Sequence, residues 1–228
     1  MGFLDIENIL FTALGYQMSY LEFFGTIAGA VAIWLSAKAN VWSWPLGIIN
    51  VVMFFFLFYQ VRLYPDMFLQ LFFFVTNIIG WRRWTHPENN EQDHKHELRV
   101  SFMPRRHWWW ILAAGLVGTL AFGTFAKNIH EIFPKVFPQS SAFPYLDSFV
   151  TVMSIVTTFL MINKKIESWA LWILVDVIAT YMYFVKDIRF VALEYLVFCF
   201  IAAFGLWNWL REYRSYQKEY RPGPATEL

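Results

Sequence analysis

The chain contains one apolar pattern twice, at a constant spacing. Residues 22–84 align without a gap with residues 147–209 at an offset of 125 positions, and 13 of the 63 aligned positions are identical. Both copies keep a Ser-Trp pair, a glycine and a closing tryptophan, which are Ser43-Trp44 and Ser168-Trp169, Gly80 and Gly205, and Trp84 and Trp209. Duplicated apolar units of this kind are typical of membrane transporters. The sequence therefore predicts two copies of a three-helix repeat.

Long apolar runs indicate that most of the chain lies in a lipid bilayer. The chain has 228 residues, of which 58% are hydrophobic and 15% charged, whereas soluble domains carry about 25% charged residues. Runs of roughly 18 residues with at most one charge are long enough to cross a hydrocarbon core of about 30 Å. An all-α membrane protein with seven transmembrane helices is expected. The predicted spans are 21–37, 45–61, 66–82, 107–126, 147–163, 169–185 and 190–209.

The N-terminal residues are not typical of a secretory signal, because Asp5 and Glu7 stand where a basic segment belongs. We expect this segment to be retained and to lie along the membrane interface. Its apolar residues recur at helical spacing, at Phe3, Ile6, Leu10 and Leu14.

The remaining chain divides by polarity. A hydrophilic stretch follows the first repeat, and a proline-punctuated loop precedes the second. The predicted parts are an interfacial segment 1–20, a first repeat 21–84, a cytoplasmic polar linker 85–106, a linker helix 107–126, an outer loop 127–146, a second repeat 147–209 and a cytoplasmic tail 210–228.

The linker helix sets the relative sense of the two repeats. If three spans were followed directly by three more, the second repeat would have the opposite orientation in the membrane. One additional crossing gives both repeats the same orientation. The prediction is a 3+1+3 arrangement of parallel repeats. With this topology 13 of the 18 Lys and Arg residues fall on the C-terminal side and 5 on the N-terminal side. By the positive-inside rule the N-terminus lies outside and the C-terminus in the cytoplasm.

Polar and aromatic side chains deep in the repeat helices are the candidate substrate contacts. Asp176 is the strongest candidate, because a carboxylate in mid-helix costs at least about 2.5–3.5 kcal/mol on insertion scales and needs a compensating role. Beside aromatic rings it suits an organic cation or a proton relay. Interhelical bonding or a place near the interface is the alternative for each residue. The candidates are Asn50, Gln70, Asn77, Trp169, Trp172, Asp176, Tyr181, Glu194 and Tyr195.

Three other features have simpler interpretations beside functional ones. The Trp108-Trp109-Trp110 run fits an interfacial aromatic belt better than a binding platform. Cys199 is alone and is expected in the core. His86, His94 and His96 could mark a metal-dependent enzyme, although a solvated linker explains them more simply. No cofactor, metal or nucleic acid is expected.

Ordered motifs resemble the PnuC family of bacterial vitamin transporters. They are Trp44-Pro45-Leu46-Gly47-Ile48-Ile49-Asn50, Leu63-Tyr64-Pro65-Asp66 with Leu69-Gln70, Gly80-Trp81-Arg82-Arg83-Trp84, Trp169-Ala170-Leu171-Trp172 with Asp176-Val177, and Leu193-Glu194-Tyr195. The resemblance covers nearly the whole chain. It implies a fold similar to a duplicated SWEET sugar-transporter unit, a homotrimer in the inner membrane, and uptake of nicotinamide riboside.

The resemblance also implies facilitated diffusion, with a separate cytoplasmic kinase trapping the substrate by phosphorylation. The sequence has no phosphate-binding loop for ATP hydrolysis. Thiamine or riboflavin uptake and proton- or ion-coupled transport remain open. At the constant offset Asn50 aligns with Val175, and only a one-residue slip would align it with Asp176.

Overall fold

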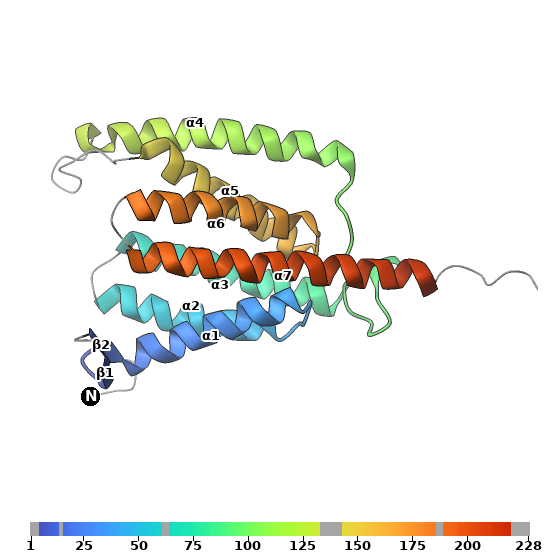
Figure 1. The fold of residues 1–228 in the computed structure, drawn as a ribbon, viewed down its shortest axis with the longest axis horizontal. Coiled ribbons are helices and arrows are strands. Elements are labelled where there is room, and N and C mark those ends of the chain that lie inside the picture. The colour runs from blue at the N-terminus through green and yellow to red at the C-terminus, as the bar shows by residue number, and fades with distance from the viewer. Residues whose placement is uncertain (1–4, 14–15, 61–63, 133–142, 186–188, 220–228) are drawn as a thin grey trace, which may run out of the picture. The chain divides into compact units, whose positions relative to one another are not determined.

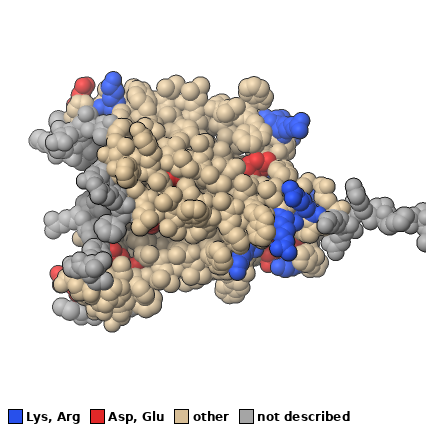
Figure 2. All heavy atoms as spheres, in the orientation of Figure 1, with Lys and Arg blue, Asp and Glu red and all other residues tan. Residues whose placement is uncertain are grey.

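The structure is a computed structural model that describes residues 5–13, 16–60, 64–132, 143–185 and 189–219. It divides into two compact units, Met1–Arg99 and Val100–Leu228, each of which is described by itself. Six helices of the described residues are long and apolar enough to cross a membrane. Most of the surface visible in Figure 2 carries neither Lys or Arg nor Asp or Glu. The chain is therefore a multi-pass membrane protein.

In the first unit three helices follow a short hairpin, which lies at the left end of α1 (Figure 1). The middle helix, α2, packs against both α1 and α3. The Ser19 hydroxyl caps the start of α1 by accepting a hydrogen bond from the Glu22 N–H at 3.1 Å. The elements are β1 (Ile9–Ala13), β2 (Tyr16–Ser19), α1 (Tyr20–Ala37), α2 (Ser43–Gln60), α3 (Tyr64–Thr85) and a 3-10 turn, η1 (Asn89–Glu91).

The N-terminal segment is a hairpin, and the helical spacing seen there was misleading. β1 and β2 pair antiparallel, with Phe11 opposite Met18. Leu10 lies in β1, while Phe3 and Leu14 lie outside the described residues. Strand pairing depends on a partner segment, which a periodicity within one segment does not reveal.

The second unit contains four long helices, each packed against the next in chain order. Glycines on α4 allow it to approach α5 closely, because a side chain at Gly118 would collide with Val152. α7 continues to Glu219, so part of the predicted tail is helical. The elements are a 3-10 turn, η2 (Arg105–His107), α4 (Trp108–Ile132), α5 (Pro144–Ile162), α6 (Glu167–Val185) and α7 (Arg189–Glu219).

The two repeats have the same local structure at the predicted offset. The turn after α1 places Ala39 at φ 54°, and the turn after α5 places Lys164 at φ 50°. The next residue in each turn donates its N–H back to the preceding helix, from Asn40 to Leu35 O at 2.9 Å and from Lys165 to Leu160 O at 3.0 Å. Neither left-handed residue is glycine, so both turns hold the same uncommon conformation.

Tryptophan pairs close both repeats in the same way. Trp44 meets Trp84 edge-on at 5.2 Å, and Trp169 meets Trp209 edge-on at 5.6 Å. The ring of the first partner lies against a glycine in each repeat, Gly80 or Gly205, where a Cβ atom would collide with it. The conserved Ser-Trp, Gly and Trp positions therefore build the scaffold.

The α3 helix includes the predicted span 66–82 but is not among the six apolar helices. Its last turn contains Arg82 and Arg83, which lower its mean hydropathy. Arg83 forms an ion pair with Glu91 at 2.5 Å.

The polar linker is more ordered than a solvated connection. In the first unit Leu98 is buried and donates its N–H to Trp84 O at 2.9 Å. In the second unit Ser101 and Lys165 form an isolated parallel β-bridge. The Met103 N–H donates a hydrogen bond to each carboxylate oxygen of Glu167, at 3.0 Å. Buried apolar residues in a polar stretch account for this order.

Candidate functional site

Polar and aromatic side chains meet in the seam between α6 and α7, within the second unit. Asp176, Thr180 and Tyr183 follow each other on α6 at helical spacing, one turn apart. On α7, the Tyr195 ring stacks on the Tyr183 ring with centroids 5.4 Å apart and planes 10° apart. Cys199, one turn further along, lies beside the Thr180 side chain. We call these five residues the α6–α7 polar cluster.

Asp176 is the charged member of the cluster. Its side chain is buried, with 4% of the residue exposed, and it lies close enough to Tyr195 and Cys199 to interact with both electrostatically. No hydrogen-bond donor to its carboxylate is found among the described residues, while its backbone oxygen accepts from the Thr180 hydroxyl at 2.7 Å. A buried carboxylate without such a donor is costly. A cationic or hydrogen-bonding ligand would supply what is missing.

The amide candidates of the first unit bond to neighbouring helices or to their own. Asn50 on α2 donates to Gly25 O on α1 at 2.8 Å. Asn77 on α3 donates to Phe73 O at 2.7 Å and lies against Gly47 of α2. The Asn50 bond matches the interhelical role that was the alternative for each amide, whereas the Asn77 bond stays within α3. Gln70 on α3 is half-buried.

The two tryptophan candidates of α6 pack in different surroundings. Trp169 is buried in its pair with Trp209 and in contact with Gly205. Trp172 is half-buried beside the apolar cluster that contains Leu171 and Val175. Trp169 is therefore part of the scaffold, whereas Trp172 keeps an exposed part.

Tyr181 and Glu194 lie outside the polar cluster. Tyr181 is 62% exposed on α6, and its position directly follows Thr180, so it points to another side of the helix. Glu194 is exposed on α7, within electrostatic reach of Tyr195. Of the nine predicted residues, the structure brings together Asp176 and Tyr195.

Thr180, Tyr183 and Cys199 belong to the cluster and are not among the nine predicted residues. Helical spacing from Asp176 through Thr180 to Tyr183, and from Tyr195 to Cys199, could have indicated them. The expectation that Cys199 is a core residue is corrected, because it is half-buried beside polar groups.

The C-terminal ends of α2 and α6 keep the constant offset. α2 ends at Gln60 and α6 at Val185, which are 125 positions apart. Asp176 therefore aligns with the buried Val51, not with Asn50.

The linker histidines do not converge. His86 Nδ1 lies 2.8 Å from the Thr85 hydroxyl, and His96 Nδ1 lies 3.2 Å from Gln92 Oε1. Across the described ranges, no group of three His, Cys, Asp or Glu residues is placed to hold a metal ion. The structure therefore offers no support for the metal-enzyme alternative.

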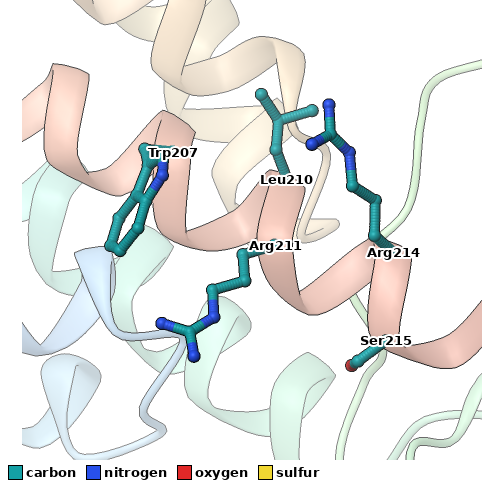
Figure 3. Close-up of a pocket in the computed structure, with 5 residues that line it drawn as sticks. All are labelled: Trp207, Leu210, Arg211, Arg214 and Ser215. Atoms are coloured by element: carbon teal, nitrogen blue, oxygen red, sulfur yellow. The ribbon is translucent and has the colours of Figure 1, made fainter.

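A shallow hollow lies along the C-terminal part of α7, away from the polar cluster. Figure 3 shows its five labelled lining residues, which follow helical spacing. Arg211 lies 5.7 Å from the Trp207 ring. None of the predicted substrate contacts lines this hollow. Its residues are Trp207, Leu210, Arg211, Arg214 and Ser215.

Comparisons with known proteins agree on a transporter family. A family model described as nicotinamide mononucleotide transporter matches residues 19–211. The nicotinamide riboside transporter PnuC of Escherichia coli is 31% identical, with 94% of this chain and 97% of the relative covered. The riboflavin/roseoflavin transporter RibM of Streptomyces davaonensis is 24% identical, with 99% and 100% covered. A crystal structure of the vitamin B3 transporter PnuC superposes with a TM-score of 0.61 at 24% identity, covering 86% and 83%.

Proposed function

Because the chain belongs to the nicotinamide mononucleotide transporter family, a family of transporters and not of enzymes, we propose that it carries nicotinamide riboside across the bacterial inner membrane. The similar proteins of Escherichia coli and Neisseria mucosa are named as nicotinamide riboside transporters. The observation that carries the proposal is the buried Asp176 carboxylate beside the stacked Tyr183 and Tyr195 rings.

The negative charge of Asp176 in the α6–α7 polar cluster favours nicotinamide riboside over nicotinamide mononucleotide and riboflavin. Nicotinamide riboside combines a cationic pyridinium ring with ribose hydroxyls, which suit a carboxylate, aromatic faces and hydroxyl groups. The mononucleotide carries an additional phosphate, and α6 has no Lys or Arg to balance it. Riboflavin has no cationic ring. Thiamine is a cation and is therefore the second candidate.

We propose direct contacts from Asp176 and Tyr195, with Trp172 contributing its exposed part. Gln70, Asn77, Tyr181 and Glu194 remain proposed contacts of lower rank, because they lie outside the polar cluster. Asn50 and Trp169 are proposed to act by holding the helices, since each is engaged in packing within its own unit.

Transport is proposed to be facilitated diffusion, with a separate cytoplasmic kinase trapping the substrate. Proteoliposomes that contain only this protein should fill with nicotinamide riboside to the external concentration and no further. An uncoupler should leave the initial rate unchanged. A proton-coupled carrier that uses Asp176 or Glu194 would instead accumulate unmodified substrate and lose it when the uncoupler is added.

The proposed architecture is a SWEET-like 3+1+3 arrangement with seven crossings, including α3, in a homotrimer. The N-terminus is placed outside and the C-terminus in the cytoplasm. In the described ranges, the single long apolar helix α4 between the two sets of three helices supports parallel copies. A C-terminal green fluorescent protein fusion should fluoresce, and a C-terminal alkaline phosphatase fusion should be inactive. The opposite pair of results would reverse the orientation.

Substrate choice is tested by calorimetry on the purified protein. Nicotinamide riboside should bind at least about tenfold more tightly than nicotinamide, the mononucleotide, thiamine or riboflavin. Nicotinamide lacks the ribose and the charge, and thiamine keeps a charge on a different ring. Preference for thiamine would keep a cation transporter and reject this substrate.

A further inference from the structure

The shallow hollow on the C-terminal part of α7 lies where the helix leaves the apolar part of the chain. Its volume is about 370 Å³, within the range of small-ligand sites, roughly 300–1,000 Å³. In Figure 3 the side chains of Trp207, Arg211 and Ser215 lie along the lower edge of the helix, and those of Leu210 and Arg214 along the upper edge. Along the chain the two apolar residues come first, so the hollow is apolar at one end and cationic further on.

The two arginines of the hollow are not neutralised by a neighbouring carboxylate. Arg211 and Arg214 are exposed, and neither forms an ion pair with a carboxylate of the described residues. Glu212, the acidic residue next to Arg211, accepts a hydrogen bond from the Tyr216 hydroxyl at 2.7 Å. Arg211 lies 5.7 Å from the Trp207 ring, which attracts a cation but carries no net charge. Two guanidinium groups, each with five N–H donors, are therefore available to an external anion.

The corresponding helix of the first repeat ends before this region. α3 ends one residue after its closing Trp84, whereas α7 continues past Trp209 to Glu219. The arginine beside the first of these tryptophans, Arg83, is ion-paired with Glu91. The scaffold that the repeats share therefore does not require the extension of α7 or its unpaired arginines.

The arginines lie at the depth of lipid phosphates. An α-helix rises about 1.5 Å per residue, so in a helix close to the bilayer normal Arg211 stands about 3 Å and Arg214 about 7.5 Å beyond Trp209, where the predicted span ends. The headgroup layer on each side of the hydrocarbon core is roughly 5–7.5 Å thick. Trp207, which is 55% exposed, lies at the inner edge of this layer, where tryptophan is enriched. The hollow therefore faces lipid headgroups.

We propose that this hollow binds the phosphate of an anionic glycerophospholipid in the leaflet at the C-terminal end of α7. Arg211 and Arg214 donate hydrogen bonds to the phosphate oxygens, as guanidinium groups do with good geometry. Trp207 and Leu210 contact the glycerol and the first methylene groups of the lipid. A free phosphate ion has no apolar part, so the apolar end of the hollow favours the lipid. The inference does not rest on the proposed function, because it requires only a chain that crosses the membrane.

Lipid titration of the delipidated protein tests the site. Purified full-length protein in a neutral detergent is titrated with phosphatidylglycerol or with phosphatidylcholine of the same acyl chains, and bound lipids are resolved by native mass spectrometry. The tightest phosphatidylglycerol should bind at least about tenfold more strongly than phosphatidylcholine, whose choline cation opposes the arginines. The double variant Arg211→Ala, Arg214→Ala should weaken this step about thirtyfold, since each arginine near anionic lipid contributes about fivefold. Equal binding of the two lipids, or no loss in the variant, would overturn the proposal.

Arg105→Ala, Arg106→Ala is the matched control, because it removes the same charge from two exposed arginines that the predicted topology places on the same side of the membrane. It should leave the tightest step within about twofold. An equal loss in both double variants would mean that net charge controls binding, and the proposal would be wrong. Arg211→Lys, Arg214→Lys keeps the charge and should retain most of the affinity. Ser215→Ala should change nothing, since that hydroxyl donates within α7.

Competition separates a lipid site from a site for a soluble anion. Inorganic phosphate in large excess should leave the tight phosphatidylglycerol step unchanged. Displacement of the lipid by inorganic phosphate would reject the lipid as the ligand of this hollow. The thermal unfolding of the Arg211→Ala, Arg214→Ala protein without lipid should match that of the wild-type protein, because both side chains are exposed. Weaker lipid binding then reports the loss of the two arginines and not a loss of folding.

Discussion

The two repeats share a scaffold and differ in where they are polar. Both have a residue with positive φ at the same position of a turn, an edge-on pair of tryptophan rings, and a glycine that contacts one of these rings. In the first repeat an amide bridges α1 and α2, from Asn50 to Gly25 O. In the second repeat the residues aligned with Gly25 and Asn50 are Val150 and Val175, which belong to an apolar cluster, and the charged carboxylate with its stacked tyrosines lies between α6 and α7.

This difference separates residues that hold helices from residues that are available to a ligand. The Asn50 amide is used in an interhelical bond, whereas no such bond to the Asp176 carboxylate is found in the described ranges. The two repeats have equivalent helices and turns. Sequence divergence at a few positions that face neighbouring helices places the charged Asp176 in the second repeat only. An asymmetric ligand such as a riboside is suited to such a pair.

The largest expected effect tests the shared scaffold. A Cβ atom at Gly205 would lie 2.6 Å from Trp169 Cε2, and one at Gly80 would come still closer to Trp44. Gly80→Ala and Gly205→Ala should each lower the free energy of unfolding by about 3 kcal/mol, the upper part of the range for overpacking. Thermal unfolding in detergent measures this.

Gly115→Ala is the control for these variants, because its added Cβ would meet only the flexible end of Met153, at 3.1 Å. It should cost much less. Strong destabilisation by one scaffold variant and not by the other would break the structural equivalence of the repeats.

The next effect tests the polarity of the second repeat. Asp176→Asn removes the charge and keeps the size of the side chain, so binding of nicotinamide riboside should weaken roughly thirtyfold, or about 2 kcal/mol, as for loss of a charged partner. Calorimetry measures the change. Val51→Ala, at the aligned position of the first repeat, should leave the affinity within about twofold. Comparable losses at both positions would show that packing and not charge controls binding.

The smallest effect concerns the amide of the first repeat. Asn50→Leu removes the bond to Gly25 O and should lower stability by about 1 kcal/mol, in line with interhelical hydrogen bonds in membrane proteins. Affinity for the riboside should change less than with Asp176→Asn. Retained stability together with lost binding would return Asn50 to the list of direct contacts.

Much of the architecture could be predicted from the sequence because it depends on local chemistry. Apolar runs, the Ser-Trp, Gly and Trp matches and the constant offset correctly indicated the helices and the equivalent tryptophan pairs. The N-terminal hairpin was missed because the periodicity of one segment does not reveal strand pairing with the next segment. The bond of Glu167 to the Met103 N–H was missed because its partners lie 64 positions apart in sequence.

The candidate site was predicted only in part. Asp176 and Tyr195 were identified because polar groups in apolar helices stand out, and Tyr183 and Cys199 were missed because a tyrosine or a lone cysteine does not. Trp169 is an aromatic residue of the kind that often contacts ligands, but its ring is buried against Trp209. Sequence alone does not separate an aromatic residue that packs from one that binds.

The central claim is that a buried carboxylate in the second repeat recognises the positive charge of the substrate. It is tested most directly by comparing nicotinamide riboside with its reduced, uncharged dihydro form, which keeps the ribose and the ring, in calorimetric titrations of the wild-type protein and Asp176→Asn. We predict that the wild-type protein binds the charged form at least about tenfold more tightly and that the difference disappears in the variant. Equal affinity of the wild-type protein for the two forms would contradict the claim.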